Sequence, residues 1–256
     1  MTRDIRVDAN RVNAKRFTTN RFNANRVDTA LFDMDGTLID SNDAHARAWA
    51  ESLHEHGIPV DAERIRPLIG MGGDKLLPAV ARVHESSALG RAIARRKGDV
   101  FQRLLPELHA TPGARALLEY LRDQHITIGI ATSAGEEELS ALLGHIGVAD
   151  LVHQRTSKDD AAESKPAPDI VYAALEECGA RPESTVLIGD TPYDIQAATR
   201  AGVGAIALRC GGYWSDGDLR DALDIFDDPL LLLAHWCDQT TADRPVRASS
   251  QRSAIS

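Results

Sequence analysis

Two aspartates two positions apart stand directly after a short apolar run, in the segment Asp33-Met34-Asp35-Gly36-Thr37. A pair of carboxylates at this spacing, followed by glycine for a turn, suits a nucleophile and an acid/base group that work beside a metal ion. The segment alone also fits an acidic strand end followed by a turn. Its meaning therefore depends on which other side chains the fold brings to the same place.

Three further segments offer groups that bind anions or cations. Thr132-Ser133 provides hydroxyl and amide donors near a helix start, and Lys165 carries a compact positive charge just before another helix. The segment Gly189-Asp190-Thr191-Pro192-Tyr193-Asp194 adds two more carboxylates. Four carboxylates in a partly desolvated cleft repel one another unless a cation lies between them. Oxygen ligands with few histidines nearby favour Mg²⁺ over zinc.

The elements that must position these groups alternate between strands and helices. Buried strands are expected at Thr29–Phe32, Ile126–Ala131, Thr185–Ile188 and Ala205–Leu208, with another short strand at Leu151–His153. Helices are expected at Gly113–Asp123, Glu136–His145, Pro168–Cys178 and Asp194–Ala201. This alternation predicts an α/β fold, with a parallel sheet covered on both faces and ligands at the carboxyl ends of the strands.

The alternation breaks after the first strand, where the sequence predicts only helices. These are expected at Asp43–His56, Asp74–His84 and Arg91–Leu105. We therefore expect residues 27–41 and 109–238 to form the α/β core and residues 42–108 to form a separate helical cap. The basic run Arg91, Arg95, Arg96 and Lys97 has helical spacing and is interpreted as a solvated face.

Both ends of the chain are expected to lie outside this fold. Residues 1–26 carry seven basic and two acidic side chains, and an arginine recurs every five residues from Arg6 to Arg26. A period of five matches neither helix nor strand, so the composition predicts a disordered arm. A nucleic-acid-binding arm and an organelle presequence are the alternatives. Residues 239–256 are similarly polar and are predicted to form a disordered tail.

The composition disfavours several classes of protein. Cys178, Cys210 and Cys237 are widely spaced with no CxxC pair, which suggests neither a disulfide framework nor a cysteine zinc site and fits the cytoplasm. No apolar run approaches the roughly 18 residues of a membrane helix, and no signal-peptide core follows the start. A net charge of −9 disfavours nucleic-acid binding outside the basic arm.

The ordered set DxDGT, Thr, Lys and GDxxxD resembles the haloacid dehalogenase (HAD) superfamily over residues 28–234. The resemblance implies a Rossmann-like hydrolase core with a helical, first-type cap inserted after the first motif. It also implies that Asp33 attacks phosphorus to form an aspartyl-phosphate, while Asp35 protonates the leaving oxygen and later activates water. The nucleophile must then stay ionised at the metal, whereas the acid/base group needs a proton to give.

The same resemblance assigns ligand-binding roles to the other motif residues. Thr132, Ser133 and Lys165 would bind the phosphoryl group. Mg²⁺ would be held by Asp33, the backbone carbonyl of Asp35, and Asp190. Asp194 would be either a direct ligand or one that acts through water.

The expected cap resembles that of the β-phosphoglucomutase and phosphoglycolate phosphatase branch. In that branch a histidine of the first cap helix helps the acid/base aspartate, and His45 holds this position; a surface or interface histidine is the alternative. Gly70 and Gly72 lie in a turn that resembles the cap loop closing over the substrate. Lys75 is either a substrate contact or an exposed charge at a helix start.

Taken together, the resemblance implies a phosphoric monoester hydrolase. The second aspartate, Asp35, favours phosphate esters, because haloacid dehalogenases and phosphonatases lack it. We expect a Mg²⁺-dependent phosphatase for a small phosphorylated metabolite such as a sugar phosphate or phosphoglycolate. A β-phosphoglucomutase-type phosphomutase is the alternative, although Ile69 and Gly73 stand where that cap loop carries Lys and Arg. A nucleic-acid-associated or scaffolding protein is disfavoured by the complete catalytic set.

Overall fold

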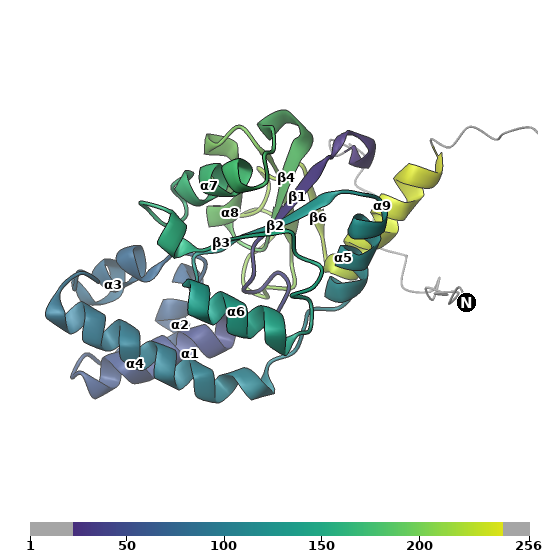
Figure 1. Cartoon of the computed structure of the whole chain (residues 1–256). Coiled ribbons are helices and arrows are strands. Elements are labelled where there is room, and N and C mark those ends of the chain that lie inside the picture. The colour runs from purple at the N-terminus through teal and green to yellow at the C-terminus, as the bar shows by residue number, and fades with distance from the viewer. Residues whose placement is uncertain (1–22, 243–256) are drawn as a thin grey trace, which may run out of the picture.

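A six-stranded parallel sheet forms the centre of the computed structural model, which describes residues 23–242 (Figure 1). The spatial order of its strands is β3-β2-β1-β4-β5-β6, and every neighbouring pair is parallel. The strands are β1 (Thr29–Phe32), β2 (Thr127–Ala131), β3 (Gln154–Thr156), β4 (Thr185–Gly189), β5 (Gly204–Leu208) and β6 (Asp224–Phe226). The predicted α/β class with a parallel sheet is confirmed.

Helices cover both faces of the sheet because successive side chains of a strand point to opposite faces. Phe32 of β1 belongs to the apolar cluster that contains α5 (Ala114–Asp123), α6 (Glu136–His145) and α9 (Pro229–Ala242). Leu31, its neighbour, belongs to the cluster that contains α7 (Asp169–Glu177) and α8 (Pro192–Arg200). Both residues are fully buried, so β1 lies between two apolar layers.

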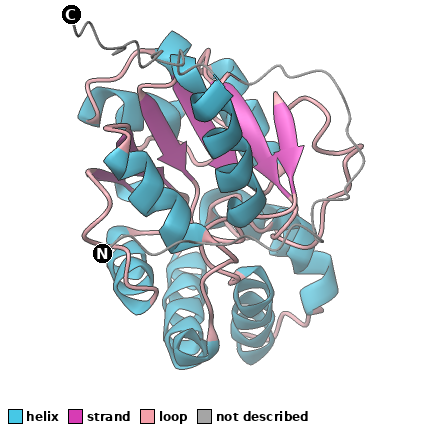
Figure 2. Cartoon of the chain, turned by 90° about the vertical axis from the view of Figure 1, so that its right-hand side faces the viewer, coloured by secondary structure: helices cyan, strands magenta, loops and turns pink. Residues whose placement is uncertain are grey.

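Four helices between β1 and β2 in the sequence pack on one another beside the sheet. They are α1 (Asn42–Glu55), α2 (Ala62–Ile65), α3 (Gly73–Ala81) and α4 (Ala88–Leu104). Leu53, Ile65 and Leu76 belong to a third apolar cluster that these helices form, whereas Ala48 of α1 and Phe101 of α4 join a cluster of the sheet. Figure 2 shows these helices below the sheet, on the side to which the strand arrows point. We call α1–α4 with their connecting loops the cap.

Two predicted segments differ from the structure. The strand expected at Leu151–His153 is wrong: Leu151 packs into the core at a turn, and β3 begins three residues later at Gln154. The strand β6 was not predicted, because its three half-buried residues at the sheet edge give no apolar run.

The folded region also extends further toward both ends than the sequence predicts. The predicted arm includes Ala24–Arg26, which form a 3₁₀ helix, η2. Ala24 is buried, and its backbone N–H donates a hydrogen bond to Gln239 Oε1 at 2.7 Å. Helix α9 continues past the predicted tail boundary to Ala242. The rest of the predicted arm and tail, residues 1–22 and 243–256, lies outside the described residues.

None of the helices in the described part combines the length and the apolar character that a bilayer crossing demands.

Alanine substitutions at two glycines test the close backbone contact between the start of α5 and the start of α9. Gly113 has φ +79°, and a Cβ there would lie 2.6 Å from the backbone of Leu230, whereas Gly179 has φ +59° with open space around it. Both Gly→Ala substitutions impose left-handed strain of about 1–2 kcal/mol. Gly113→Ala should cost roughly 1–3 kcal/mol more, because backbone atoms must move apart. Urea unfolding measures both free energies, and equal losses would contradict the close approach.

Candidate active site

The carboxyl edge of the sheet, which faces the cap, collects the motif residues from four separate segments. Asp33 follows β1, Thr132 follows β2 and Asp190 follows β4, while Lys165 lies in the loop before α7. The edge is tied together by backbone hydrogen bonds, such as that from Asp33 N to Ile188 O at 2.8 Å. The sequence therefore predicted correctly that residues far apart in the chain meet here.

Lys165 is fully buried and lies between two carboxylates. Its Nζ is 2.6 Å from Asp33 Oδ1 and 2.7 Å from Asp194 Oδ1. Burial alone would lower the pKa of Lys165, but Asp194 and Asp33 together raise it above the ordinary lysine value. The lysine is therefore charged at neutral pH and fixed in place.

The two carboxylates that contact this lysine form a buried cluster with a third, that of Asp190. Asp33, Asp190 and Asp194 each offer one oxygen, and these oxygens lie within 4.8 Å of one another. Burial raises the pKa of Asp33 to about 7, although Lys165 opposes the shift. Burial also raises the pKa of Asp190, and the charges of Asp194 and Asp33 add to the rise. One lysine cannot balance three ionised carboxylates, so the cluster has the excess negative charge that a cation would neutralise.

The backbone around Asp190 fits its carboxylate closely. A Cβ on either Gly36 or Gly211 would overlap that carboxylate. Asn42 Nδ2 also donates a hydrogen bond to Asp190 Oδ2 at 2.8 Å. No sequence pattern pointed to Asn42, which is the first residue of α1 and resembles an ordinary helix-start residue. Buried oxygen donors held this firmly, with surplus negative charge, fit Mg²⁺.

Asp35 has a different environment from Asp33. Its Oδ1 accepts a hydrogen bond from Ser41 Oγ at 2.5 Å and lies 2.7 Å from His45 Nε2. Burial alone would raise the pKa of Asp35, but His45, Ser41 and Lys97 lower it to about 2. The carboxylate of Asp35 is not among the three clustered ones. Only its backbone carbonyl was predicted to bind metal.

His45 is buried, as a residue at a catalytic site or an interface would be. Its ring stacks on Phe101 of α4, with ring centroids 3.9 Å apart and an angle of 10° between the ring planes. The stacking holds Nε2 against Asp35. Two cap helices therefore position one side chain at the carboxylate of a core residue.

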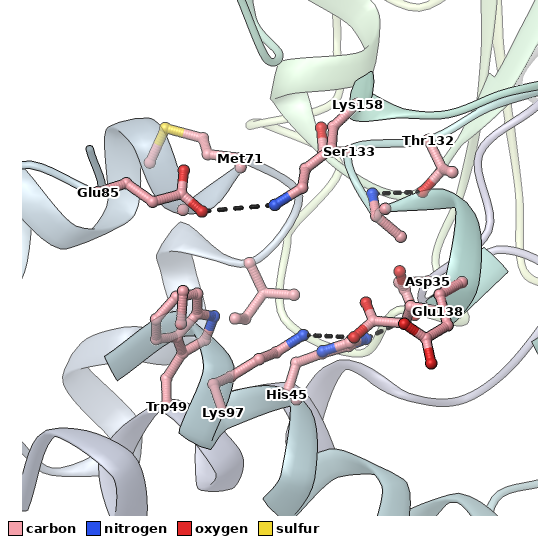
Figure 3. A pocket seen from close by; sticks show the side chains of 18 of the residues that line it. Asp35, His45, Trp49, Met71, Glu85, Lys97, Thr132, Ser133, Glu138 and Lys158 are labelled. Atoms are coloured by element: carbon pink, nitrogen blue, oxygen red, sulfur yellow. Dashed lines mark hydrogen bonds and ion pairs between the residues drawn. The ribbon is translucent and has the colours of Figure 1, made fainter. Parts of the chain in front are cut away.

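A cavity of about 440 Å³ lies between the cap and the core and is lined by Asp33 and Asp35. Figure 3 shows Asp35 beside His45 and Glu138 on its wall. Its volume falls within the range of about 300–1,000 Å³ typical of ligand sites. Ser133 Oγ donates to Gly70 O at 3.2 Å, which joins the core loop after β2 to the cap loop. The predicted site residues that line the cavity are Asp33, Asp35, His45, Gly70, Gly72, Thr132 and Ser133.

Lys75 does not reach this cavity, so the structure does not bring it to the predicted substrate contact. Its Nζ donates to Ser164 O at 2.6 Å and pairs with Glu163 Oε2 at 3.2 Å. The start of α3 faces the loop before Lys165, and Gly72 N also donates to Ser164 Oγ there, at 3.1 Å. Lys75 thus joins the cap to the core outside the cavity.

Sequence reasoning missed two ion pairs that line the cavity. Lys97 Nζ on α4 lies 2.8 Å from Glu138 Oε2 on α6, and Lys158 Nζ lies 3.4 Å from Glu85 Oε1. Lys97 was interpreted as part of a solvated face, but its side chain is only 12% exposed and lies 4.9 Å from the centroid of the Phe101 ring. Each pair joins a cap residue to a core residue, a relation that sequence spacing does not reveal.

Comparisons with known proteins agree with this geometry. Residues 30–208 match the family of haloacid dehalogenase-like hydrolases, so the chain belongs to that family. Fructose-1-phosphate phosphatase YqaB from Escherichia coli is 29% identical over 182 residues, which cover 70% of this chain and 95% of that protein. Phosphoglycolate phosphatase from Rhodospirillum rubrum is 30% identical over 210 residues, covering 77% and 86%. The chain is a phosphoric monoester hydrolase of this superfamily, as predicted.

Solved structures show the same architecture. A hydrolase from Pseudomonas syringae superposes with a TM-score of 0.76 and 32% identity, covering 82% of this chain and 98% of that chain. A β-phosphoglucomutase from Clostridium difficile has a TM-score of 0.73 at 20% identity, covering 84% and 98%. At that identity the second likeness shows the fold alone. The relatives and the folds together fit the predicted branch of the superfamily.

The raised pKa values in the carboxylate cluster predict how stability depends on pH. Asp33 has a pKa of about 7 in the folded chain and 3.8 as its ordinary value, so the metal-free protein should lose stability as the pH rises from about 4 to 7. Mg²⁺ should restore that stability, and restore more of it at higher pH, because it binds the ionised carboxylates. Thermal melting in EDTA and in Mg²⁺, across this pH range, measures the effect.

Asp33→Asn is the matched variant for this measurement. It removes one titrating carboxyl, so the gap between the melting temperatures in Mg²⁺ and EDTA should change less with pH than in the wild type. A wild-type gap that is independent of pH would contradict the predicted titration.

Proposed function

We propose that the enzyme is a Mg²⁺-dependent phosphatase that hydrolyses a small phosphorylated metabolite through an aspartyl-phosphate on Asp33. The observation that carries the proposal is the buried Lys165 between Asp33 and Asp194, with Asp190 in the same carboxylate cluster; of these residues Asp33 lines the cavity. The printed substrates of two relatives, fructose 1-phosphate and phosphoglycolate, are small phosphomonoesters and support this substrate class.

Asp33 acts as the nucleophile in this proposal. One carboxylate oxygen of Asp33 attacks phosphorus while the bond from phosphorus to the ester oxygen breaks on the opposite side. Lys165, which hydrogen-bonds Asp33 Oδ1, holds that carboxylate in one orientation and offers positive charge to the phosphoryl oxygens. Thr132 and Ser133, at the end of β2, supply hydroxyl and amide donors to the same oxygens.

The metal would be held by Asp33, Asp190, Asp194 and the backbone carbonyl of Asp35. Its bound charge supplies the electrostatic stabilisation that keeps Asp33 ionised and offsets the negative charge of the phosphoryl group.

Asp35 gives a proton to the leaving oxygen, which departs as an alcohol. It later takes a proton from the water that attacks phosphorus, as the bond from phosphorus to Asp33 breaks and inorganic phosphate forms. In the free enzyme the pKa of Asp35 is about 2, so the carboxyl is ionised before substrate binds. The negative phosphoryl group raises that pKa when it arrives. His45 Nε2 lies 2.7 Å from Asp35 Oδ1, so a proton held on that nitrogen reaches the carboxylate along a single hydrogen bond.

The proposed nucleophile is tested by Asp33→Asn. The substitution should lower phosphate release from sugar phosphates, phosphoglycolate and p-nitrophenyl phosphate by about 10³-fold or more, because an amide is not a nucleophile at phosphorus. Asp28→Asn is the matched control, since Asp28 stands just before β1, at the opposite end of that strand, and has a side chain that is 73% exposed. Wild-type release should stop in EDTA and return with Mg²⁺. An Asp33→Asn variant as fast as wild type would exclude the proposed nucleophile.

Product analysis separates the proposed phosphatase from the alternative phosphomutase. With a hexose 1-phosphate as substrate, a phosphatase releases inorganic phosphate and free hexose. A mutase instead forms the 6-phosphate with little phosphate release. We expect free hexose as the product.

His45→Ala tests the proton-holding role of the histidine. We expect kcat to fall by about 10²-fold with a smaller change in KM, because proton transfer to the leaving oxygen is impaired. Losing His45 also raises the pKa of Asp35, which must hold a proton to give it to the leaving oxygen, so the basic limb of the rate profile should move to higher pH. Thermal melting controls for the lost stacking on Phe101. Unchanged kcat in a folded variant would exclude the role.

A further inference from the structure

The cavity is strongly acidic outside the proposed phosphoryl site, and this feature bears on which phosphomonoester it accepts. The inference rests on the proposed function. Among the described residues, three lysine and arginine side chains line the cavity, namely Arg95, Lys97 and Lys158. Besides Asp33 and Asp35, the carboxylates that line it are Glu85, Asp99, Glu136, Glu137, Glu138 and Asp159.

Two of the three cations are already neutralised by carboxylates of the same cavity. Lys97 pairs with Glu138 at 2.8 Å, and the two side chains are only 12% and 18% exposed. Lys158 pairs with Glu85 at 3.4 Å. Figure 3 shows the two pairs at different places on the cavity wall, each crossing from cap to core. Neither lysine therefore offers a free positive charge to a ligand.

The third cation, Arg95, adds little attraction for a bound anion. Arg95 is exposed, and it stands on α4 one helical turn before Asp99, which is also exposed and also lines the cavity. Opposite charges at this spacing lie on the same side of a helix. Water screens a charge in that position, so Arg95 attracts a bound anion weakly.

Glu138 lies where the part of the substrate next to the ester oxygen must pass. Its carboxylate, the Asp35 carboxylate and a His45 ring nitrogen lie within 4.8 Å of one another. Asp35 is the proposed donor of a proton to the ester oxygen, so the first carbons attached to that oxygen lie close to Glu138. A negative charge there would face a carboxylate whose lysine is already paired.

We propose that this enzyme selects phosphomonoesters whose remaining part is uncharged or carries an amine, and that it discriminates against a carboxylate or a second phosphate. Hydroxyl and ammonium groups donate hydrogen bonds to carboxylates, whereas a second anion is repelled by them. Glu138 and Glu85 are the specificity-determining residues, because each cancels the charge of a lysine that would otherwise bind a second anion.

A two-carbon substrate series tests the selection with little change in size. The three probes are 2-aminoethyl phosphate, 2-hydroxyethyl phosphate and phosphoglycolate, which differ in the charge at one end. We expect kcat/KM for 2-hydroxyethyl phosphate to exceed that for phosphoglycolate at least tenfold, and 2-aminoethyl phosphate to be at least as good as 2-hydroxyethyl phosphate. The difference should lie mainly in KM, because the charge at the far end does not change during the reaction.

Glu138→Gln tests the residue directly. The amide leaves Lys97 without its anionic partner, so kcat/KM for phosphoglycolate relative to 2-hydroxyethyl phosphate should rise at least fivefold. Glu55→Gln is the matched control: it removes one of the two carboxylate partners of Arg96, which stands next to Lys97 on α4, and neither Glu55 nor Arg96 lines the cavity. Glu85→Gln, which frees Lys158, is the second variant, assayed with sorbitol 6-phosphate and 6-phosphogluconate. Thermal melting confirms that each variant is folded.

The outcomes separate the inference from the proposed function. Wild-type enzyme that hydrolyses phosphoglycolate as well as 2-hydroxyethyl phosphate would overturn the selection, while phosphatase activity would stand. A preference for phosphoglycolate that is lost in Arg95→Gln would overturn it too, and would assign the anion site to Arg95. The assignment of Glu138 and Glu85 would be overturned if their variants changed kcat/KM for the anionic substrate, relative to its uncharged counterpart, no more than Glu55→Gln does. If neither the series nor p-nitrophenyl phosphate is hydrolysed, the proposed function fails and the inference with it.

Discussion

A lysine buried between two carboxylates is the interaction on which the active site depends. Lys165, Asp33 and Asp194 come from three separate segments, and their contacts are 2.6 Å and 2.7 Å long. Asp194 is held by its own helix, because Thr191 Oγ1 donates to its Oδ2 at 2.6 Å in a capping box. Its other oxygen is thereby left to Lys165. A helix-start motif thus fixes the position of a charged group in the active site.

The same interaction leaves the site short of positive charge. Removing one partner of a buried ion pair leaves the other charge buried without a counter-charge, which destabilises the fold. The lysine and both carboxylates therefore stabilise the site only together. Asp190 then adds a third carboxylate, and no cation among the described residues lies within hydrogen-bonding distance of it, although Asn42 satisfies one of its oxygens. The protein holds this arrangement at a cost in stability, which a bound cation would offset.

The core of the site was predictable from local sequence, and its surroundings were not. The strands β1, β2 and β4 appear as short β-branched runs, and the chain placed Asp33, Thr132 and Asp190 directly after them. A parallel sheet then brings those residues to one edge without further information. Local signals also placed α6 from Glu136 to His145, as the structure has it.

Contacts between the cap and the core leave no comparable trace in the sequence. Glu138 meets Lys97 and Lys158 meets Glu85 only because two separately folded layers come together. The basic run on α4 fits a solvated helix face equally well, and burial of Lys97 under Phe101 decides the matter. Lys75 is the opposite case: its place beside two cap glycines fitted either a substrate contact or an exposed charge at a helix start, whereas α3 directs it to Ser164.

The two cap-to-core ion pairs run in opposite senses. At one, the cap contributes the lysine and the core the glutamate; at the other, the cap contributes the glutamate and the core the lysine. A cap that exchanged these two positions would set Lys97 against Lys158 and Glu85 against Glu138. The pair of Lys158 and Glu85, whose side chains are 40% and 24% exposed, contributes about 0–1 kcal/mol. Because their charge order is opposite, the two pairs together favour a single orientation of the cap on the core, the one in which His45 meets Asp35.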